Sequence, residues 1–213
     1  MLHYILETGA SLHHEVECYC HAKYYPMGDP RSTVDYVNEL KNDNRRHSLA
    51  VISCYEKQLT AAIVPDFARL AQVYGPMLVC GIPRSKRTNS YSDDCMGLKR
   101  GIRAAVRQVS QLSDGLDCIV RHTDTKTTHL KYSGRFGYGG NGEMPRPGIT
   151  RDTCSISPEV AGKTVLLVDD IYTPGVGIDE DAVQALLDAG ASRVIFYAVG
   201  KAMGTMSGYR LAA

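Results

Sequence analysis

Short apolar runs alternate with stretches of helical periodicity through the second half of the chain. Four runs that lack polar alternation predict buried strands, at 77–80, 116–120, 164–168 and 193–199. Apolar residues at steps of three and four predict two helices between them. Over 92–112 these residues are Leu98, Ile102, Ala105, Val106, Val109 and Leu112. Over 177–189 they are Ile178, Ala182, Ala185, Leu186 and Ala189.

The pattern over the first 76 residues is less regular. Partial alternation over 12–19 predicts a strand, and Ser32 is placed to cap a helix that begins there. The apolar run 49–54 fits a strand or a helix equally well. Residues 59–74 have helical periodicity, and Pro65 marks either a kink or the start of that helix.

This order of elements predicts the fold class. Strands that alternate with helices are typical of α/β proteins, and apolar strands favour a mostly parallel central sheet flanked by helices. In such a sheet, ligands bind beyond the carboxyl ends of the strands. The residues that follow each strand are therefore the candidates for function.

Composition and charge narrow the class of protein. The chain has 213 residues, 44% of them hydrophobic, and a net charge of +1, which argues against a dedicated nucleic-acid surface. No apolar stretch is long enough to predict a membrane span. The first residues lack a basic start followed by a long apolar run, so we expect no secretory signal and a cytoplasmic location.

Seven cysteines bear on the redox state and on metal binding. Their odd number and wide spacing argue against a disulfide framework, which fits a reducing compartment. The densest group of potential metal ligands comprises His13, His14, Cys18, Cys20 and His21. Cys18 and Cys20 lack the usual two-residue gap and no second cysteine pair follows. A zinc site there stays open, against the alternative that these are ordinary buried or surface residues.

Two adjacent carboxylates, Asp169 and Asp170, follow the strand at 164–168. Their repulsion requires an offsetting partner, such as a metal cation, a cationic side chain or sugar hydroxyls. The next residues form a glycine-containing loop that opens a helix, and its amides suit a phosphate. An acid pair beside a phosphate loop predicts a sugar-phosphate site. The alternative is a strand–turn–helix junction whose acids only cap the helix.

A basic turn follows the strand at 77–80. It consists of Ile82, Pro83, Arg84, Ser85, Lys86 and Arg87, and its three cations suit a polyanion such as pyrophosphate. The alternative is a solvated basic turn. After the strand at 116–120, half of the residues in 133–148 are glycine or proline, which predicts a long loop that is either functional or a disordered connection.

The run VLLVDDIYTPGVG resembles the phosphoribosyl pyrophosphate (PRPP) signature of type I phosphoribosyltransferases. The resemblance implies that Asp169 and Asp170 hold the ribose hydroxyls. It also implies that the following loop binds the ribose and 5-phosphate, namely Ile171, Tyr172, Thr173, Pro174, Gly175, Val176 and Gly177. Pro174 and Gly177 depart from the family's threonines, which removes one N–H and one hydroxyl from the phosphate loop.

The run GIPRSKRTNSYS is similar to the basic segment of the competence-associated, ComF-like branch of this family. The resemblance implies that residues 82–87 bind pyrophosphate and that Arg121, at the start of a closing loop, joins Asp169 and Asp170 in catalysis. It covers about residues 77–200, without the four-cysteine zinc module that ComF-like proteins often carry. We therefore expect a phosphoribosyltransferase-like core over 61–213, with a variable N-terminal segment or hood over 1–60 packed on it.

The family reaction transfers phosphoribose from PRPP to a nitrogenous base or amine and releases pyrophosphate. The resemblance implies Mg²⁺ as cofactor, held by Asp169 and Asp170 directly or through water. The alternative is a non-catalytic PRPP- or nucleotide-binding module used in regulation or DNA uptake. The sequence leaves open whether the protein forms a homodimer.

The charged residues are distributed unevenly between the two candidate segments. Seven basic and two acidic residues lie in 84–107, whereas 166–190 has six acids and no Lys or Arg.

Overall fold

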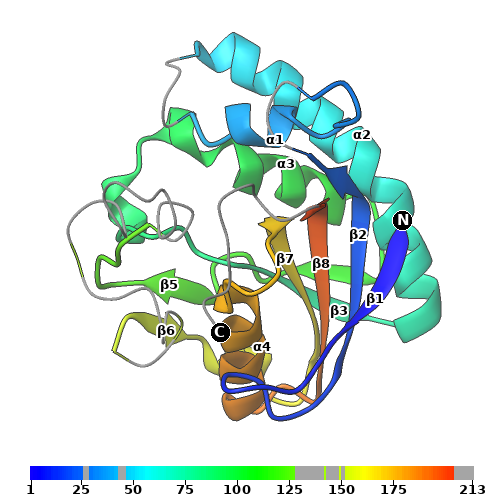
Figure 1. Cartoon of the computed structure of the whole chain (residues 1–213), viewed down its shortest axis with the longest axis vertical. Coiled ribbons are helices and arrows are strands. Elements are labelled where there is room, and N and C mark those ends of the chain that lie inside the picture. Colours follow the sequence, from blue (N-terminus) through cyan, green and yellow to red (C-terminus); the bar gives the residue numbers. More distant parts are fainter. Residues whose placement is uncertain (26–28, 43–46, 128–141, 143–148, 150–151, 204–213) are drawn as a thin grey trace, which may run out of the picture.

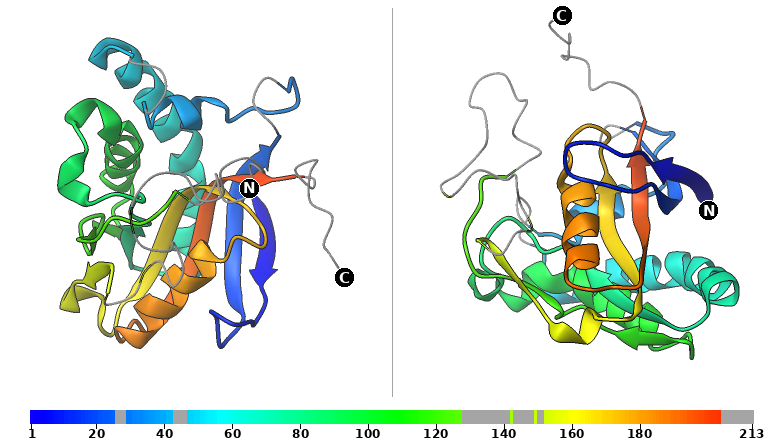
Figure 2. Two further views of the ribbon diagram at one scale, coloured as in Figure 1. Left: turned by 60° about the vertical axis from the view of Figure 1, so that its left-hand side comes forward. Right: turned by 90° about the horizontal axis from the view of Figure 1, so that it is seen from below.

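A computed structural model describes residues 1–25, 29–42, 47–127, 142, 149 and 152–203. Its centre is a six-stranded sheet with the strand order β1-β2-β8-β7-β3-β4. Figures 1 and 2 show α4 on one face of this sheet, and α2 and α3 on the other. The described part of the chain is therefore a three-layer α/β structure, as the sequence predicts.

The strands differ in direction and in sheet. The central sheet contains β1 (Leu2–Leu6), β2 (Val16–Tyr24), β3 (Met77–Gly81), β4 (Leu112–Asp114), β7 (Thr164–Tyr172) and β8 (Arg193–Ala202). Its neighbouring strands are parallel, except that β1 runs antiparallel to β2. A second sheet consists of β5 (Ile119–Arg121) and β6 (Cys154–Ile156), which are antiparallel.

The described helices are α1 (Tyr36–Glu39), α2 (Leu49–Tyr74), α3 (Gly97–Val106) and α4 (Ile178–Asp188). Short 3₁₀ turns lie at Thr88–Ser90, Asp93–Met96 and Pro158–Val160. Among the described residues, no helix combines the length and apolar character that crossing a membrane requires.

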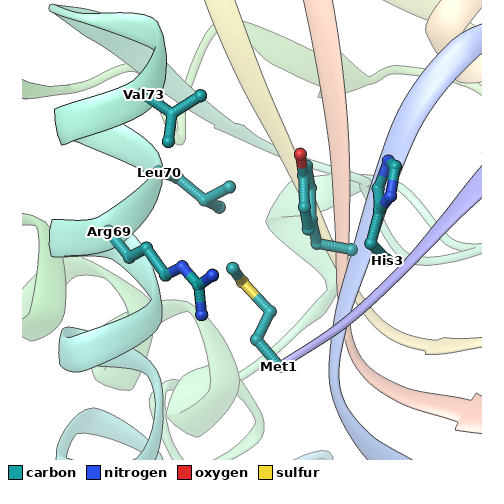
Figure 3. A pocket seen from close by; sticks show the side chains of 6 residues that line it. Met1, His3, Arg69, Leu70 and Val73 are labelled. Carbon is teal, nitrogen blue, oxygen red and sulfur yellow. The ribbon is translucent and has the colours of Figure 1, made fainter.

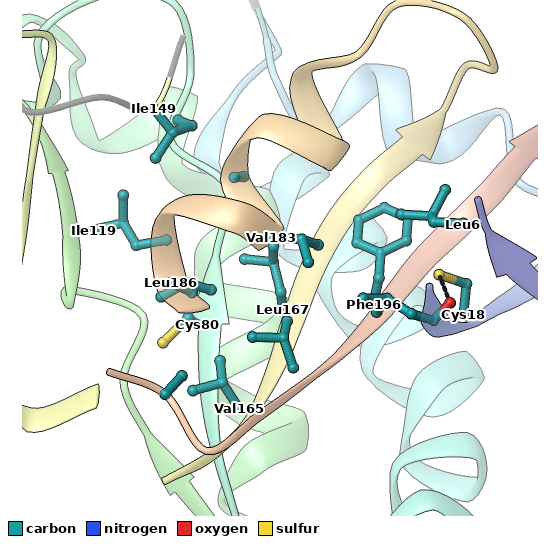
Figure 4. Packing of buried hydrophobic residues seen from close by; sticks show 14 of the residues in the cluster. Leu6, Cys18, Cys80, Ile119, Ile149, Val165, Leu167, Val183, Leu186 and Phe196 are labelled. Atoms are coloured by element: carbon teal, nitrogen blue, oxygen red, sulfur yellow. Dashed lines mark hydrogen bonds between the residues drawn. The ribbon is translucent and has the colours of Figure 1, made fainter. Parts of the chain in front are cut away.

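The hydrophobic core lies on both faces of the central strands. Alternate residues of β7 and β8 pack into the layer that contains α4, and the others pack into the layer that contains α2 and α3. Val165, Leu167, Val183, Leu186 and Phe196 belong to the α4 layer (Figure 4). Burial on both faces explains why these strands lack polar alternation.

The predicted strand at 116–120 is the main error in the topology. The strand that pairs with β3 at the edge of the sheet is β4, in a register that runs from Met77 with Leu112 to Val79 with Asp114. Ser113 and Asp114 are exposed on this short edge strand, so no apolar run marks it. Leu116 is buried in a turn instead, and β5 begins at Ile119 in the separate sheet.

Two predicted boundaries in the second half also shift. The helix expected over 92–112 is confined to α3, because 3₁₀ turns precede it and Leu112 already belongs to β4. The strand expected to end at 168 continues through Asp169 and Asp170, because pairing with β8 extends to Tyr172. The acid pair therefore lies within β7 and not after it.

The N-terminal residues enter the central sheet. The strand expected over 12–19 runs instead from Val16 to Tyr24, and β1 adds an outer strand. Residues 49–54 form the first turns of α2, which continues through Pro65, so that proline does not start the helix. The expected division at residue 60 falls inside α2 and does not coincide with a break between elements.

Candidate functional site

The two acids of β7 project to opposite faces of the central sheet. Asp169 hydrogen-bonds Asp179 of α4, on one face. Asp170 is almost fully buried and forms an ion pair with Lys41, which lies just after α1. Figure 1 shows α1 beyond the carboxyl ends of β7 and β8, the edge where ligands bind in parallel sheets.

Lys41 is the partner that the adjacent acids require. Burial by itself would raise the pKa of Asp170, but the Lys41 ammonium and the Ile171 N–H, 2.7 Å from Asp170 Oδ1, hold it below its usual value. Burial opposes the charge on Lys41, yet Asp170 and Asp169 raise its pKa. The sequence indicated that a cationic side chain could offset the acids, but nothing in its pattern identified Lys41.

Asp179 belongs to the site as well, although the sequence did not single it out. Burial and the nearby Asp169 carboxylate, with which it is hydrogen-bonded, raise its pKa well above the usual range. Burial and Asp170 also raise the pKa of Asp169. The result is an acid cluster that carries less negative charge than its composition suggests.

The loop after β7 has a backbone that favours glycine. Gly175 and Gly177 have φ angles of +81° and +78°, and the Val176 N–H donates to the Thr173 carbonyl at 3.2 Å. Gly177 caps α4 in a left-handed conformation, which a threonine would adopt only at a cost. Glycine at position 177 therefore has a conformational reason.

Three acids occupy the first turn of α4: Asp179, Glu180 and Asp181. Asp181 accepts from the Ile149 N–H at 2.5 Å, and Glu180 accepts from the Tyr172 hydroxyl at 3.1 Å. Acids here interact favourably with the helix dipole and compete with an incoming phosphate. The anion site predicted at this loop is thus less positive than a bare helix N-terminus.

The basic turn lies beside the acid pair. The Ile82 N–H donates to the Val168 carbonyl at 3.0 Å, which joins the turn to β7 one residue before Asp169. Arg84 Nη1 donates to the carbonyl oxygens of Lys41 and Cys95, at 3.2 and 3.0 Å. The predicted pyrophosphate and ribose segments therefore lie next to each other, and Arg84 also contacts the segment that carries Lys41.

Residues 124–127 form hydrogen bonds with other residues of the basic turn. Lys86 Nζ donates to the Thr125 carbonyl at 2.9 Å, and the backbone N–H of Arg87 donates to Asp124 Oδ1 at 2.8 Å. The Ser85 carbonyl accepts from the Thr125 N–H at 2.7 Å. The turn is consequently ordered by its neighbours. A pyrophosphate group would have to exchange with some of these contacts.

Arg121 is expected at the start of a closing loop, but it lies in β5 with only 3% of its surface exposed. Its Nε donates to the Arg84 carbonyl at 2.6 Å. Burial lowers its pKa. In this structure Arg121 supports the backbone of the basic turn. Most of the predicted loop at 133–148, together with residues 128–129, lies outside the described residues.

The cysteines considered for zinc are buried in β2. Burial raises the pKa of Cys18 to about 12 and also raises that of Cys20, so both remain neutral thiols at pH 7. His21 hydrogen-bonds Asp66 instead, at 2.9 Å. No group of three or more His, Cys, Asp or Glu side chains in the described part of the chain is arranged to hold a metal ion.

A cavity of about 130 Å³ lies apart from this site, between α2 and strands β1 and β2 (Figure 3). It is lined by Met1, His3, Tyr19, Arg69, Leu70 and Val73. None of these residues belongs to the acid pair, the loop at 171–177 or the basic turn. Nothing in the sequence pattern indicated this cavity.

Comparison with known proteins does not assign the chain to a family. No protein-family model matches the chain, and no curated protein matches it.

Proposed function

We propose that the protein binds PRPP and transfers phosphoribose to a nitrogenous base or amine, with release of pyrophosphate. The observation that carries the proposal is the side-by-side placement of an acid pair and a basic turn. Asp169 and Asp170 lie in the carboxyl-terminal half of β7, and the Ile82–Val168 hydrogen bond joins the start of the basic turn to β7 one residue before them. PRPP carries hydroxyls on one side of its reacting C1–O bond and pyrophosphate on the other. Its hydroxyls would face the acids, and its pyrophosphate would face the basic turn.

In the proposed reaction, each of the three segments binds a different part of the substrate. The acids orient the ribose hydroxyls, residues 171–177 bind the 5-phosphate, and residues 82–87 bind the pyrophosphate. The bond from C1 to the new nitrogen forms as the bond from C1 to the pyrophosphate oxygen breaks, and pyrophosphate leaves with the electron pair. Positioning and charge stabilisation would supply most of the rate enhancement.

Magnesium is part of the proposal as the ion that would neutralise pyrophosphate next to the ribose hydroxyls. Asp169 and Asp170 present hard oxygen donors that fit such an ion, directly or through water. Because Asp170 is paired with Lys41, most other ligands would come from the substrate and from water.

A second candidate is a module that binds PRPP or a nucleotide without turnover. Three features favour it: Lys41 already occupies Asp170, acids fill the first turn of α4, and Pro174 removes an N–H from the phosphate loop. Each of these features weakens the binding of a substrate that must be positioned precisely for the reaction.

One assay tests both candidates. The protein is incubated with PRPP, Mg²⁺ and a panel of bases, pyrophosphate release is measured, and PRPP binding is followed by calorimetry. Release that is lost in the double variant Asp169→Asn, Asp170→Asn supports the enzyme. Binding without release supports the module, and binding unaffected by the double variant contradicts both. Asp152→Asn with Asp188→Asn, two exposed acids elsewhere, is the matched control.

A further inference from the structure

Lys41 lies where the two halves of the candidate site meet. Its ammonium pairs with Asp170 and is close enough to Asp169 for that carboxylate also to raise its pKa. Its carbonyl accepts a hydrogen bond from Arg84 of the basic turn. The same residue therefore contacts Asp170 of the proposed ribose-binding acids with its side chain and the proposed pyrophosphate-binding turn with its backbone.

The chain around Lys41 is built to hold it there. Asn42 has a φ of +50°, an uncommon conformation for a residue other than glycine. Its Nδ2 donates to Asp94 Oδ2 at 3.0 Å and to the His47 carbonyl at 3.3 Å, while its Oδ1 accepts from the His47 N–H at 2.8 Å. These bonds fix the backbone next to Lys41, so the position of its ammonium is not that of a free surface lysine.

Arg84 is a second cation near Lys41. Its guanidinium contacts the Lys41 carbonyl, and its charge opposes that of the ammonium, although Asp170 and Asp169 outweigh it and raise the pKa of Lys41. The Lys41 side chain keeps 29% of its surface exposed, whereas its partner Asp170 keeps 8%. A polyanion bound between them would relieve the repulsion and gain charge-assisted hydrogen bonds.

We infer that Lys41 is a pyrophosphate-binding residue contributed by the N-terminal segment, which neutralises Asp170 in the free protein and turns to the polyanion when substrate binds. This rests on the proposed function, because it assumes that PRPP occupies the acid pair and the basic turn. Substrate hydroxyls take over Asp170 as the ammonium leaves it. The exchange keeps both charged groups partnered throughout.

The test uses inorganic pyrophosphate alone and PRPP with Mg²⁺, each titrated calorimetrically into the full chain. Lys41→Met should weaken pyrophosphate binding about tenfold or more, because a charge-assisted contact is lost. Lys41→Arg should retain most of the affinity. Lys57→Met, at an exposed position of α2, is the matched control and should leave affinity unchanged.

A double variant separates ligand binding from mere neutralisation of Asp170. Lys41→Met with Asp170→Asn removes both charges, so its melting temperature should recover relative to Lys41→Met. If Lys41 binds pyrophosphate, the affinity of the double variant stays low. Recovery of pyrophosphate affinity together with stability would overturn the inference.

Titration with both PRPP and pyrophosphate distinguishes a failure of this inference from a failure of the proposed function. Wild-type protein that binds PRPP, with unchanged pyrophosphate affinity in Lys41→Met, contradicts the role of Lys41 alone. Wild-type protein that binds neither ligand contradicts both the inference and the proposed function.

Discussion

Asp66 is a buried carboxylate in the middle of α2, and its partners come from distant strands. His21 Nδ1 and the Tyr197 hydroxyl both lie 2.9 Å from Asp66 Oδ2. Burial would raise the pKa of Asp66, but these hydrogen bonds hold it below its usual value. A single residue thus joins α2 to β2 and β8.

The pH dependence of stability should reflect this residue. Because the folded-state pKa of Asp66 is depressed, its contribution is present above the unfolded value of about 3.9 and is lost as pH falls through the folded value. Asp66→Asn should lower the free energy of unfolding at pH 7 by about 1–3 kcal/mol. It should also reduce the loss on acidification from about pH 5 to about pH 2.5, measured by urea denaturation.

Asp152→Asn, at an exposed position, is the control and should change neither quantity. Equal acid sensitivity in wild type and Asp66→Asn would show that Asp66 titrates normally.

A second prediction at this scale concerns Gly177. Its φ of +78° places an L side chain in a disfavoured conformation, so Gly177→Ala should destabilise the protein by about 1 kcal/mol. Gly9→Ala is the comparison, because a Cβ at Gly9 would have no neighbour within 4 Å and the φ of Gly9 is not positive. If the two variants unfold at the same denaturant midpoint, a conformational cost at Gly177 is contradicted.

At the scale of elements, α3 packs closely on α2 because two of its residues lack side chains. A Cβ on Gly101 would lie 2.8 Å from Leu59 Cδ2, and one on Gly97 would lie 2.7 Å from Ile52 Cγ2. Thr60 of α2 also donates to the Gly101 carbonyl, at 3.0 Å. Glycine therefore sets the separation of these helices.

Gly101→Ala should therefore destabilise the fold by about 1–3 kcal/mol through overpacking. In a Leu59→Ala background the added methyl group has room, so the same change should cost much less. The two free energies, measured by chemical denaturation, form a double-mutant cycle. Additive effects would mean that the two residues do not meet.

At the scale of the whole molecule, the small sheet is tied to the central sheet through the basic turn. Arg121 of β5 donates to the Arg84 carbonyl, and Arg84 in turn donates to the carbonyl of Lys41. The small sheet, the basic turn and the N-terminal segment are thereby connected in series. Loss of the Arg121 contact should therefore loosen the basic turn.

Arg121→Lys tests this connection. Lysine keeps the charge but lacks the planar guanidinium, so the Nε contact to Arg84 is lost and stability should fall by about 1–3 kcal/mol. Amide hydrogen exchange in residues 84–87 should become faster than in wild type. Arg107→Lys, at an exposed position, is the control. Unchanged exchange in the turn would contradict the proposed connection.

The sequence by itself determined the features that depend on local pattern. Apolar runs identified β3, β7 and β8, because strands buried on both faces leave no polar alternation. Adjacent acids before a glycine-containing loop identified the region of the candidate site. The polar edge strand β4 was missed for the same reason, since a strand with little burial leaves no apolar run to read.

Which distant residues meet at that site depends on how the elements pack in three dimensions. Lys41 pairs with Asp170, Asp179 hydrogen-bonds Asp169, and β1 and β2 join a sheet whose other strands come much later in the chain. No local spacing encodes such contacts, because they arise when helices and strands pack. The sequence required a partner for the acids, and the fold determined that an N-terminal lysine provides it.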